Sequence, residues 1–436
     1  MTASHPPGTA QHASAQPYAV GPGFGGDEPL EPMYTLEFAQ HPHAAYERWR
    51  SSYGPLVPVE LAPGVPATLV LGYTTAVRIL NDPEHFPADP RIWQRSVHAG
   101  CPVLPMMEWR PNALRSTGYE HRRYRMANVS ALDTVDLYGM RAVVEQIAVP
   151  LINDFCSGTG NSGDMHRSMA SADLLGQYIY PLVYRVLAFV LGFDDDTNEQ
   201  VGTGMAMMFD AAGEAEAGSA MLVAALDEHI RRKRARPGGD VTSHLIASGD
   251  LSTEELIHQL VTLQGAGSEP QVHLISNALL LMMTDERFAG DLIDGSLSTR
   301  DALDEVLFTN PPLANYCITY PPQPILVEGV WLPAHQPVVI SMAGCNADPT
   351  IQSDRLARSG NRAHLAWSLG PHQCPARQLG YQIAMDAIDY LLDALPELRL
   401  AVAIDELVWR PGPFHRALES LPTVFPQSPQ LPLLTE

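Results

Sequence analysis

A single cysteine, Cys374, stands in the segment of the sequence best suited to chemistry. The ten residues 367–376 read WSLGPHQCPA, and an amphipathic helical pattern follows from about 377 to 395. Glycine and proline favour a tight loop, and Pro375 is typical of a first helical residue. We therefore expect Cys374 at a helix N-terminus, where the helix dipole and free backbone N–H groups favour a thiolate, the form of cysteine that binds metals.

A second chemical pair is His121 with Arg125. Residues four apart share one face of a helix, so these two side chains can bind the same carboxylate. Histidine and arginine are common on protein surfaces, and the pair gains meaning only together with the cysteine segment.

The cysteine segment resembles the haem-binding signature of the cytochromes P450. That signature is an aromatic residue, two residues, Gly, one residue, His or Arg, one residue, Cys, one residue, Gly. Trp367, Gly370, His372 and Cys374 fall in register, with Trp in place of the usual Phe, and Ala376 replaces the last Gly. The resemblance implies haem b, with Cys374 as the iron ligand, Trp367 packed on its side of the haem and His372 facing a propionate.

The resemblance runs from about residue 40 to the end of the chain. Residues 118–125 look like the helix C of the family, in which His121 and Arg125 would bind a haem propionate. Other matching segments follow in family order: Asp82-Pro83 with Phe86, Arg236 to Asp240, Asn346 to Pro349, and Trp409 to Pro422. The implied fold is mainly α, a large helical domain with a small β-rich subdomain, formed by residues 31–436 as one haem domain.

Residues 263–270 resemble the helix I stretch Ala-Gly-x-Glu/Asp-Thr, which crosses the distal face of the haem. The resemblance places Ala266 and Gly267 against the haem. Without it, the glycine would indicate close helix packing and Glu269 a solvated helix face.

Pro270 occupies the position of the family's threonine, whose hydroxyl helps to deliver protons to iron-bound oxygen. Protons would then come from Glu269, Ser268 or water. Proline lacks an N–H and crowds the carbonyl four residues earlier, so it should open the helix beside Ala266 and shape the distal groove.

Helix K also departs from the family, because Glu305 is followed by Phe308 where the pattern Glu-x-x-Arg has arginine. A buried acid without its partner costs about 3–5 kcal/mol, so this glutamate must be neutral, solvated or paired elsewhere. The propionate-binding arginine after helix K is missing too, since Ile318 and Thr319 occupy its neighbourhood. These departures resemble an atypical actinobacterial branch of the family. Candidate partners for the glutamate are Arg355, Arg358 and Arg362.

As a P450-like protein, the chain is expected to oxidise a small lipophilic molecule with O2. No Rossmann glycine fingerprint follows a strand, so electrons would come from a ferredoxin or flavodoxin with its reductase, docking around Arg122, Arg123 and Arg377. The distal pocket would be apolar and would include Met106, Met107 and Trp109, unless these side chains are ordinary core.

The missing threonine and arginine leave two other functions open. One is a non-catalytic P450-like protein that stabilises or regulates a partner protein. The other is a haem sensor or a peroxide-using enzyme. Hydrolase chemistry is a poor fit, because the sequence has neither an H-E-x-x-H nor a G-x-S-x-G motif.

The bulk properties agree with a folded enzyme. The formal net charge is −22 and Lys233 is the only lysine, which argues against nucleic acid or an anionic membrane as partner. Residues 1–30 are rich in Gly, Pro, Ala and Ser and are expected to be disordered, and no run of about twenty apolar residues follows. Five widely spaced cysteines indicate neither a disulfide framework nor a zinc site. These features predict the cytoplasm.

The residues named above must be positioned mostly by helices. Apolar residues at three- and four-residue spacing predict helices over 170–191, 205–230 and 256–283, within a region that reads as helical from 133 to 300. Strand-like runs are few, at residues 55–61, 67–71, 325–332, 338–342 and within 398–425.

Overall fold

The computed structural model describes residues 30–98, 100–156, 169–209, 214–288, 297–351 and 361–432. The segment expected to be disordered, 1–30, lies outside the described residues except for Leu30, and so do two of the arginines named as candidate partners, Arg355 and Arg358.

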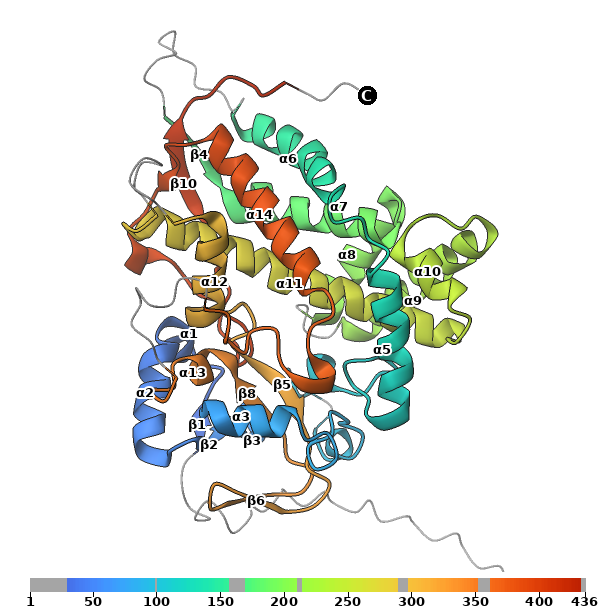
Figure 1. Ribbon diagram of the computed structural model, residues 1–436, viewed down its shortest axis with the longest axis vertical. Coiled ribbons are helices and arrows are strands. Elements are labelled where there is room, and N and C mark those ends of the chain that lie inside the picture. The colour runs from blue at the N-terminus through green and yellow to red at the C-terminus, as the bar shows by residue number, and fades with distance from the viewer. Residues whose placement is uncertain are drawn as a thin grey trace, which may run out of the picture.

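Helices form the larger part of the molecule, and α11 runs through its middle (Figure 1). Around it lie α5 (Gly118–Leu132), α6 (Met140–Cys156), α7 (Tyr180–Leu191), α8 (Asp195–Phe209), α9 (Ala215–Ala235), α10 (Val241–Ala247), α12 (Thr299–Thr309) and α14 (Arg377–Ala394). Among the described residues, no single helix is long and apolar enough to cross a membrane; only the bent pair Leu175–Leu191 with Asp195–Met208 passes such a test, and only jointly.

The central helix α11 (Thr253–Thr284) confirms the pattern read at 256–283. Ser252 caps it, and Ser252 and Glu255 form a reciprocal capping box that satisfies two backbone N–H groups. The helix is continuous through Pro270, so the predicted opening beside Ala266 is wrong. Proline must still cost the helix one backbone hydrogen bond, but a long buried helix keeps the bonds on either side and its packing holds the local geometry.

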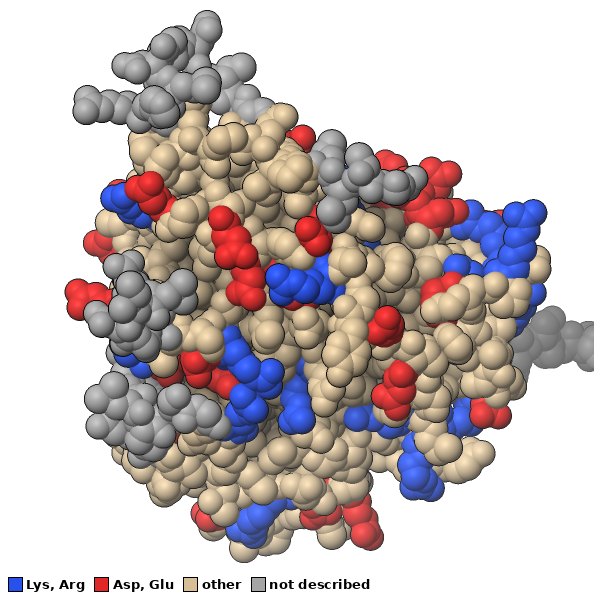
Figure 2. Space-filling model, turned by 45° about the horizontal axis from the view of Figure 1, so that its top comes forward, with Lys and Arg blue, Asp and Glu red and all other residues tan. Residues whose placement is uncertain are grey.

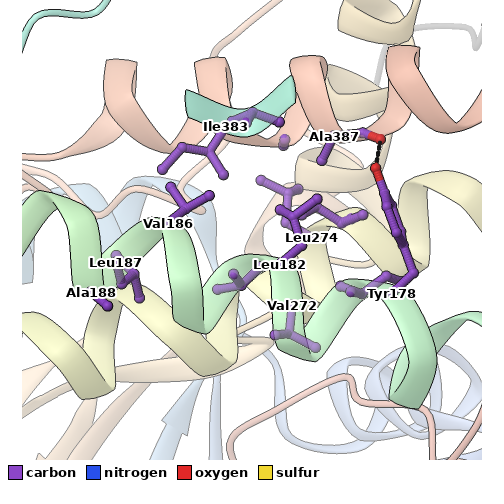
Figure 3. Packing of buried hydrophobic residues seen from close by; sticks show 14 of the residues in the cluster. Tyr178, Leu182, Val186, Leu187, Ala188, Val272, Leu274, Ile383 and Ala387 are labelled. Carbon is purple, nitrogen blue, oxygen red and sulfur yellow. Dashed lines mark hydrogen bonds between the residues drawn. The ribbon is translucent and has the colours of Figure 1, made fainter. Parts of the chain in front are cut away.

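Packing between α7, α11 and α14 makes the main core (Figure 3). Leu182 and Val186 of α7 lie between Leu274 of α11 and Ile383 of α14 in a single buried cluster. Each such side chain contributes roughly 1.5–3 kcal/mol when fully buried. Tyr178 ties the layers further, because its hydroxyl donates to the carbonyl of Ala387 at 2.6 Å. This core fixes the spacing between α11, which carries Glu269, and α14, which follows the cysteine loop.

A five-stranded sheet with the strand order β1-β2-β3-β8-β5 forms the smaller part. Its strands are β1 (Glu31–Pro32), β2 (Leu56–Glu60), β3 (Pro66–Val70), β5 (Asn315–Thr319) and β8 (Val338–Ser341). The short helices α1 (Leu36–Gln40), α2 (Pro42–Tyr53), α3 (Tyr73–Leu80), α4 (Leu104–Met107) and α13 (Met342–Asn346) and the hairpin β6 (Ile325–Val327) and β7 (Val330–Leu332) complete this part. Its buried residues form a second hydrophobic cluster, distinct from the first. The fold is that expected, a large helical domain with a small β-rich subdomain.

Two of the predicted helices are wrong in their extent. Residues 169–173 form strand β4 (Met169–Asp173), which pairs with β10 (Pro422–Pro426), and β9 (Arg399–Leu400) completes a three-stranded sheet. A π-helical turn, Leu175–Ile179, then leads into α7. The pattern over 205–230 is divided between α8 and α9. Pairing with β10, some 250 residues away, decides the first case and is not readable from local periodicity.

Candidate functional site

The loop before α14 holds Cys374 in a closed backbone geometry. The Cys374 N–H donates to the carbonyl of Trp367 at 2.8 Å, and the Gln373 N–H donates to the carbonyl of Gly370 at 3.1 Å. Gly370 has φ +65°, and a Cβ there would collide with the carbonyl of Leu80. Glycine is required at this position for both reasons.

Helix α14 begins at Arg377, with Ala376 as its N-cap, so the prediction that Pro375 is the first helical residue is wrong. The thiol of Cys374 still faces donors, because the Ala376 N–H binds the sulfur. Burial raises the pKa of the Cys374 thiol, while that N–H and the charges of Arg125 and Arg377 act in the opposite direction. A positive ion at the sulfur would add to these three and favour the thiolate.

Two histidine rings meet beside this loop. His121 of α5 and His372 lie with ring centroids 4.1 Å apart. Burial, assisted by neighbouring positive charges, lowers the pKa of His121 to about 4 and that of His372 to about 3. Nε2 of His121 is buried without a hydrogen-bond partner. The arginine predicted to act with them, Arg125, is within electrostatic range of both His372 and the thiol of Cys374.

A further cation, Arg115, joins this group and was missed by the sequence analysis. Its side chain is buried, at 3% exposure, and donates to the Tyr316 hydroxyl at 2.6 Å and to the Met106 carbonyl. Its charge helps to lower the pKa of His372. Several positive or proton-accepting groups thus converge, and no carboxylate of the described residues acts on the two histidines, which is the arrangement that an external dianion satisfies.

Arg115 belongs to no motif that the sequence shows. It lies in the turn before α5, where the Asn112 side chain accepts from the Arg115 N–H at 2.9 Å. Ile318 and Thr319, which stand where the family's arginine was sought, are both buried in strand β5. Arg115 contacts this same strand through Tyr316 but reaches it from a distant part of the chain.

On the other side of the site, α11 presents Ala266 as an exposed residue in the middle of a largely buried helix. A flat ligand can therefore approach the backbone closely here. Gly267 lies on the side of α11 that faces α7, because a Cβ at this residue would lie 3.2 Å from a methyl carbon of Leu187 on α7. Ser268 is almost fully buried, at 1% exposure.

Glu269, one turn away, is anchored from three sides. Its carboxylate accepts from the Tyr180 hydroxyl at 3.1 Å, lies 3.1 Å from Nε2 of His273, and accepts from the Arg410 guanidinium at 3.4 Å. Burial acts to raise the pKa of Glu269, but these three partners outweigh it and hold the pKa at about 2. Pro270, the next residue, is half-buried and carries no hydroxyl.

Comparisons with known proteins bear on this site. The chain is 28% identical over 402 residues to the cytochrome P450 monooxygenase PikC of Streptomyces venezuelae, covering 88% of this chain and 91% of PikC. It is 27% identical over 370 residues to the 2-hydroxy-5-methyl-1-naphthoate 7-hydroxylase of Streptomyces carzinostaticus, covering 81% of this chain and 88% of that enzyme. No protein-family model matches it.

The fold comparison agrees. The solved structure of CYP154C4 from Streptomyces sp. W2061 superposes with a TM-score of 0.79 at 25% identity, covering 91% of this chain and 98% of that one. The chain is a cytochrome P450. It is accordingly a haem-thiolate oxidoreductase of the monooxygenase kind, with haem as its cofactor.

The residues of this P450 fit a haem group on independent grounds. A haem brings two propionates, and in the part of the chain that the structure describes no carboxylate acts on the two histidines of the cluster formed by His121, Arg125, His372 and Arg115. It brings an iron, and Cys374 offers a sulfur. Ala266 is exposed on α11, whereas Cys374 and the four residues of the cluster lie on other elements. A haem has two faces and an edge, so different elements must contact each of them.

The P450 rebuilds the helix K link with different residues. Asp304, the residue before Glu305, accepts from Nε of Arg362 at 2.9 Å and from the Tyr381 hydroxyl of α14. The candidate Arg362 therefore pairs with the neighbouring aspartate. Glu305 itself lies 3.7 Å from the guanidinium of Arg287 and is buried.

Phe308, which stands in place of the arginine, packs edge-on against His364 with ring centroids 5.3 Å apart. The side chain of Asn346 completes the connection by donating to the carbonyls of Leu307 and Phe308 and accepting from the Leu365 N–H. Helix α12 is thus joined to the start of the cysteine loop by an amide and an aromatic contact.

Proposed function

We propose that this P450 hydroxylates a small lipophilic substrate held over Ala266, with Glu269 as the proton-handling group of the distal side. The observation that carries the proposal is the three-partner anchoring of Glu269, one turn from the exposed Ala266. Bound haem would supply the oxidising chemistry, with Cys374 as its thiolate ligand. The chain itself must place the substrate and deliver protons.

Proton delivery in this proposal uses a carboxylate in the absence of an alcohol. Glu269 is ionised at neutral pH and is half-exposed, so it can hold water molecules that carry protons to the distal face. Behind it, His273 is almost fully buried, and its Nδ1 has no hydrogen-bond partner. The Nε2 of His273 lies 3.1 Å from the Glu269 carboxylate and holds it in place. Ser268, being buried, is less well placed for this role.

The substrate side is expected to be apolar. Met106 and Trp109 are half-buried ahead of α5, whereas Met107 is fully buried within the β-rich cluster and belongs to the core. The guanidinium of Arg91 lies 5.1 Å from the ring centroid of Trp109, which holds the indole in place. A lipophilic molecule of the kind that related P450s oxidise would fit such a surface.

Electrons would come from a ferredoxin or flavodoxin with its reductase. Arg122 and Arg377 are exposed on the side of the cysteine loop and are available to an acidic partner. The third candidate, Arg123, is engaged in an ion pair with Glu255 and contributes less free charge. Replacing Arg122 or Arg377 by Glu should slow reduction by the partner, with Arg231→Glu on α9 as the control, because Arg231 is exposed and pairs with Asp227 and Glu228 of its own helix. An unchanged rate would exclude this surface.

We also propose the cytoplasm as the compartment, because all five cysteines are free thiols.

The primary test is spectroscopic. The reduced protein under carbon monoxide should show a thiolate-type Soret band, and Cys374→Ser should lose it while keeping its fold. Turnover with a redox partner then separates the monooxygenase from a haem sensor, a peroxide-using enzyme or a non-catalytic partner protein. A protein that takes up no haem after reconstitution would refute the proposal.

A further inference from the structure

A cavity of about 510 Å³ opens beside the cysteine loop. It is lined by side chains of the loop, of the N-terminal ends of α12 and α14, and of the segment that precedes the loop. The charged and aromatic residues among them are Arg300, Arg362, His364, Arg377 and Tyr381. None of them contributes to the distal side of the haem site.

Positive charge dominates this lining. Among the described residues, Arg377 has no hydrogen-bond or ion-pair partner and Arg300 has no acidic partner. The guanidinium of Arg300 lies 5.0 Å from the ring centroid of Tyr381. Arg362 is partly neutralised by its ion pair with Asp304. The whole chain has 27 basic and 49 acidic side chains, so a cavity with three arginines and no acidic lining residue is a local reversal of charge. Figure 2 shows a group of basic side chains near the centre of one face, with acidic ones around it.

A buried histidine adds an independent sign of a ligand. His364 lines the cavity and is 7% exposed, yet neither of its ring nitrogens has a hydrogen-bond partner. Its other neighbour is Phe308, which replaces the helix K arginine and offers nothing polar. Leaving such polar atoms unpaired in the interior costs on the order of 1–3 kcal/mol. Both nitrogens are shielded from solvent, so a ligand in the cavity would bind them only after the ring turns toward it.

We propose that this cavity binds the phosphate group of a small molecule. A phosphate dianion can accept from the guanidinium groups of Arg300 and Arg377 at once, and guanidinium matches phosphate geometry better than any other side chain. Gln373, Gln378 and Gln382 also line the cavity and can donate to further oxygens. The volume leaves room for a group larger than inorganic phosphate, which favours a phosphate ester or pyrophosphate over the free ion.

If the redox partner docks as proposed above, the ligand would compete with it for Arg377; this consequence rests on the proposed function, whereas binding itself does not.

The test is calorimetric titration of the haem-loaded protein with pyrophosphate, inorganic phosphate and citrate at constant ionic strength in a phosphate-free buffer. We expect pyrophosphate to bind, and Arg300→Gln and Arg377→Gln each to weaken it roughly tenfold. Arg78→Gln is the matched control, because Arg78 is an exposed arginine on α3 outside the cavity. Binding that survives both cavity substitutions, or no binding at all, would overturn the proposal. Equal binding of citrate would overturn the assignment to phosphate.

A second measurement locates the ligand without relying on the fold of a variant. In protein labelled with ¹³C at the histidine rings, the His364 signal, assigned through His364→Phe, should shift on addition of pyrophosphate, while His335 in the β-rich part should not. A shift confined to other histidines would place the ligand elsewhere and refute the site. Neither experiment requires turnover or a redox partner, so its failure is distinct from failure of the proposed function.

Discussion

Arg115 gives the most direct test of how this P450 holds its haem. We expect Arg115→Gln to fold but to lose haem faster than the wild-type protein. The residue is buried, belongs to no family motif and acts together with Arg125 on the pKa of His372, with no carboxylate of the described residues among the causes. Glutamine keeps a donor for the Tyr316 hydroxyl or the Met106 carbonyl but removes the charge.

The size of the effect follows from the contacts. A hydrogen bond to a charged group contributes about 1.5–3 kcal/mol, which corresponds to roughly 10- to 100-fold in a dissociation rate. Three other groups, His121, Arg125 and His372, would still face the propionates, so loss should be accelerated but not complete. Because Arg115 also anchors Tyr316 of β5, a decrease in stability of about 1–2 kcal/mol should accompany it.

Haem transfer to an excess of a haem-scavenging globin, followed at the Soret band, measures this rate. Arg123→Gln is the matched control: it removes an arginine from the same region whose partner is Glu255, and it should lower stability without accelerating haem loss. If Arg115→Gln released haem at the wild-type rate, Arg115 would not be the cation that replaces the missing arginine after helix K.

Three further predictions concern stability and coupling. Arg123 holds the pKa of Glu255 at about 2, below its unfolded value, so Glu255→Gln should cost about 1–2 kcal/mol at pH 7, and urea unfolding should show this difference shrinking as pH falls from about 4.5 to 2. Phe308→Ala should destabilise by about 3 kcal/mol in the same assay, whereas Phe189→Ala, at 59% exposure, should change stability by less than about 0.5 kcal/mol. Pro270→Thr should improve coupling of electron use to product, and Pro270→Ala should stabilise α11 without improving coupling. Equal coupling in both variants would show that the threonine hydroxyl has no effect on it.

The parts of the molecule that depend on neighbouring residues were predictable. Residue 370 has a positive φ and lies close to the Leu80 carbonyl, and only glycine satisfies both conditions. The sequence shows this requirement directly, as a glycine shortly before Cys374. The long apolar pattern over 256–283 likewise yields α11, because periodicity records burial on a helix. Strand β4 was misread as helix, since its pairing with β10 comes from the far end of the chain.

Site residues brought in from a distance were harder to predict. Arg115 and Arg410 act through Tyr316 and Glu269, residues that lie 201 and 141 positions away. A sequence shows no spacing rule at such separations. His273 was missed for a different reason: it lies one turn from Glu269, and the i, i+4 pairing was available in the sequence but gave no reason to choose it over other helical pairs.

Helix K shows how a P450 can exchange a charged link for a different one. An arginine at position 308 would be buried beside His364, where it would add a charge near a ring whose pKa burial already lowers to about 4. With phenylalanine there, the charge moves to Arg362, which is half-exposed and can be solvated while it pairs with Asp304. Desolvating an arginine fully is costly, so moving the ion pair to the surface edge and filling the interior with an aromatic ring can preserve stability. The aromatic ring that fills position 308 offers His364 no hydrogen bond, which agrees with the unpaired ring nitrogens of this histidine.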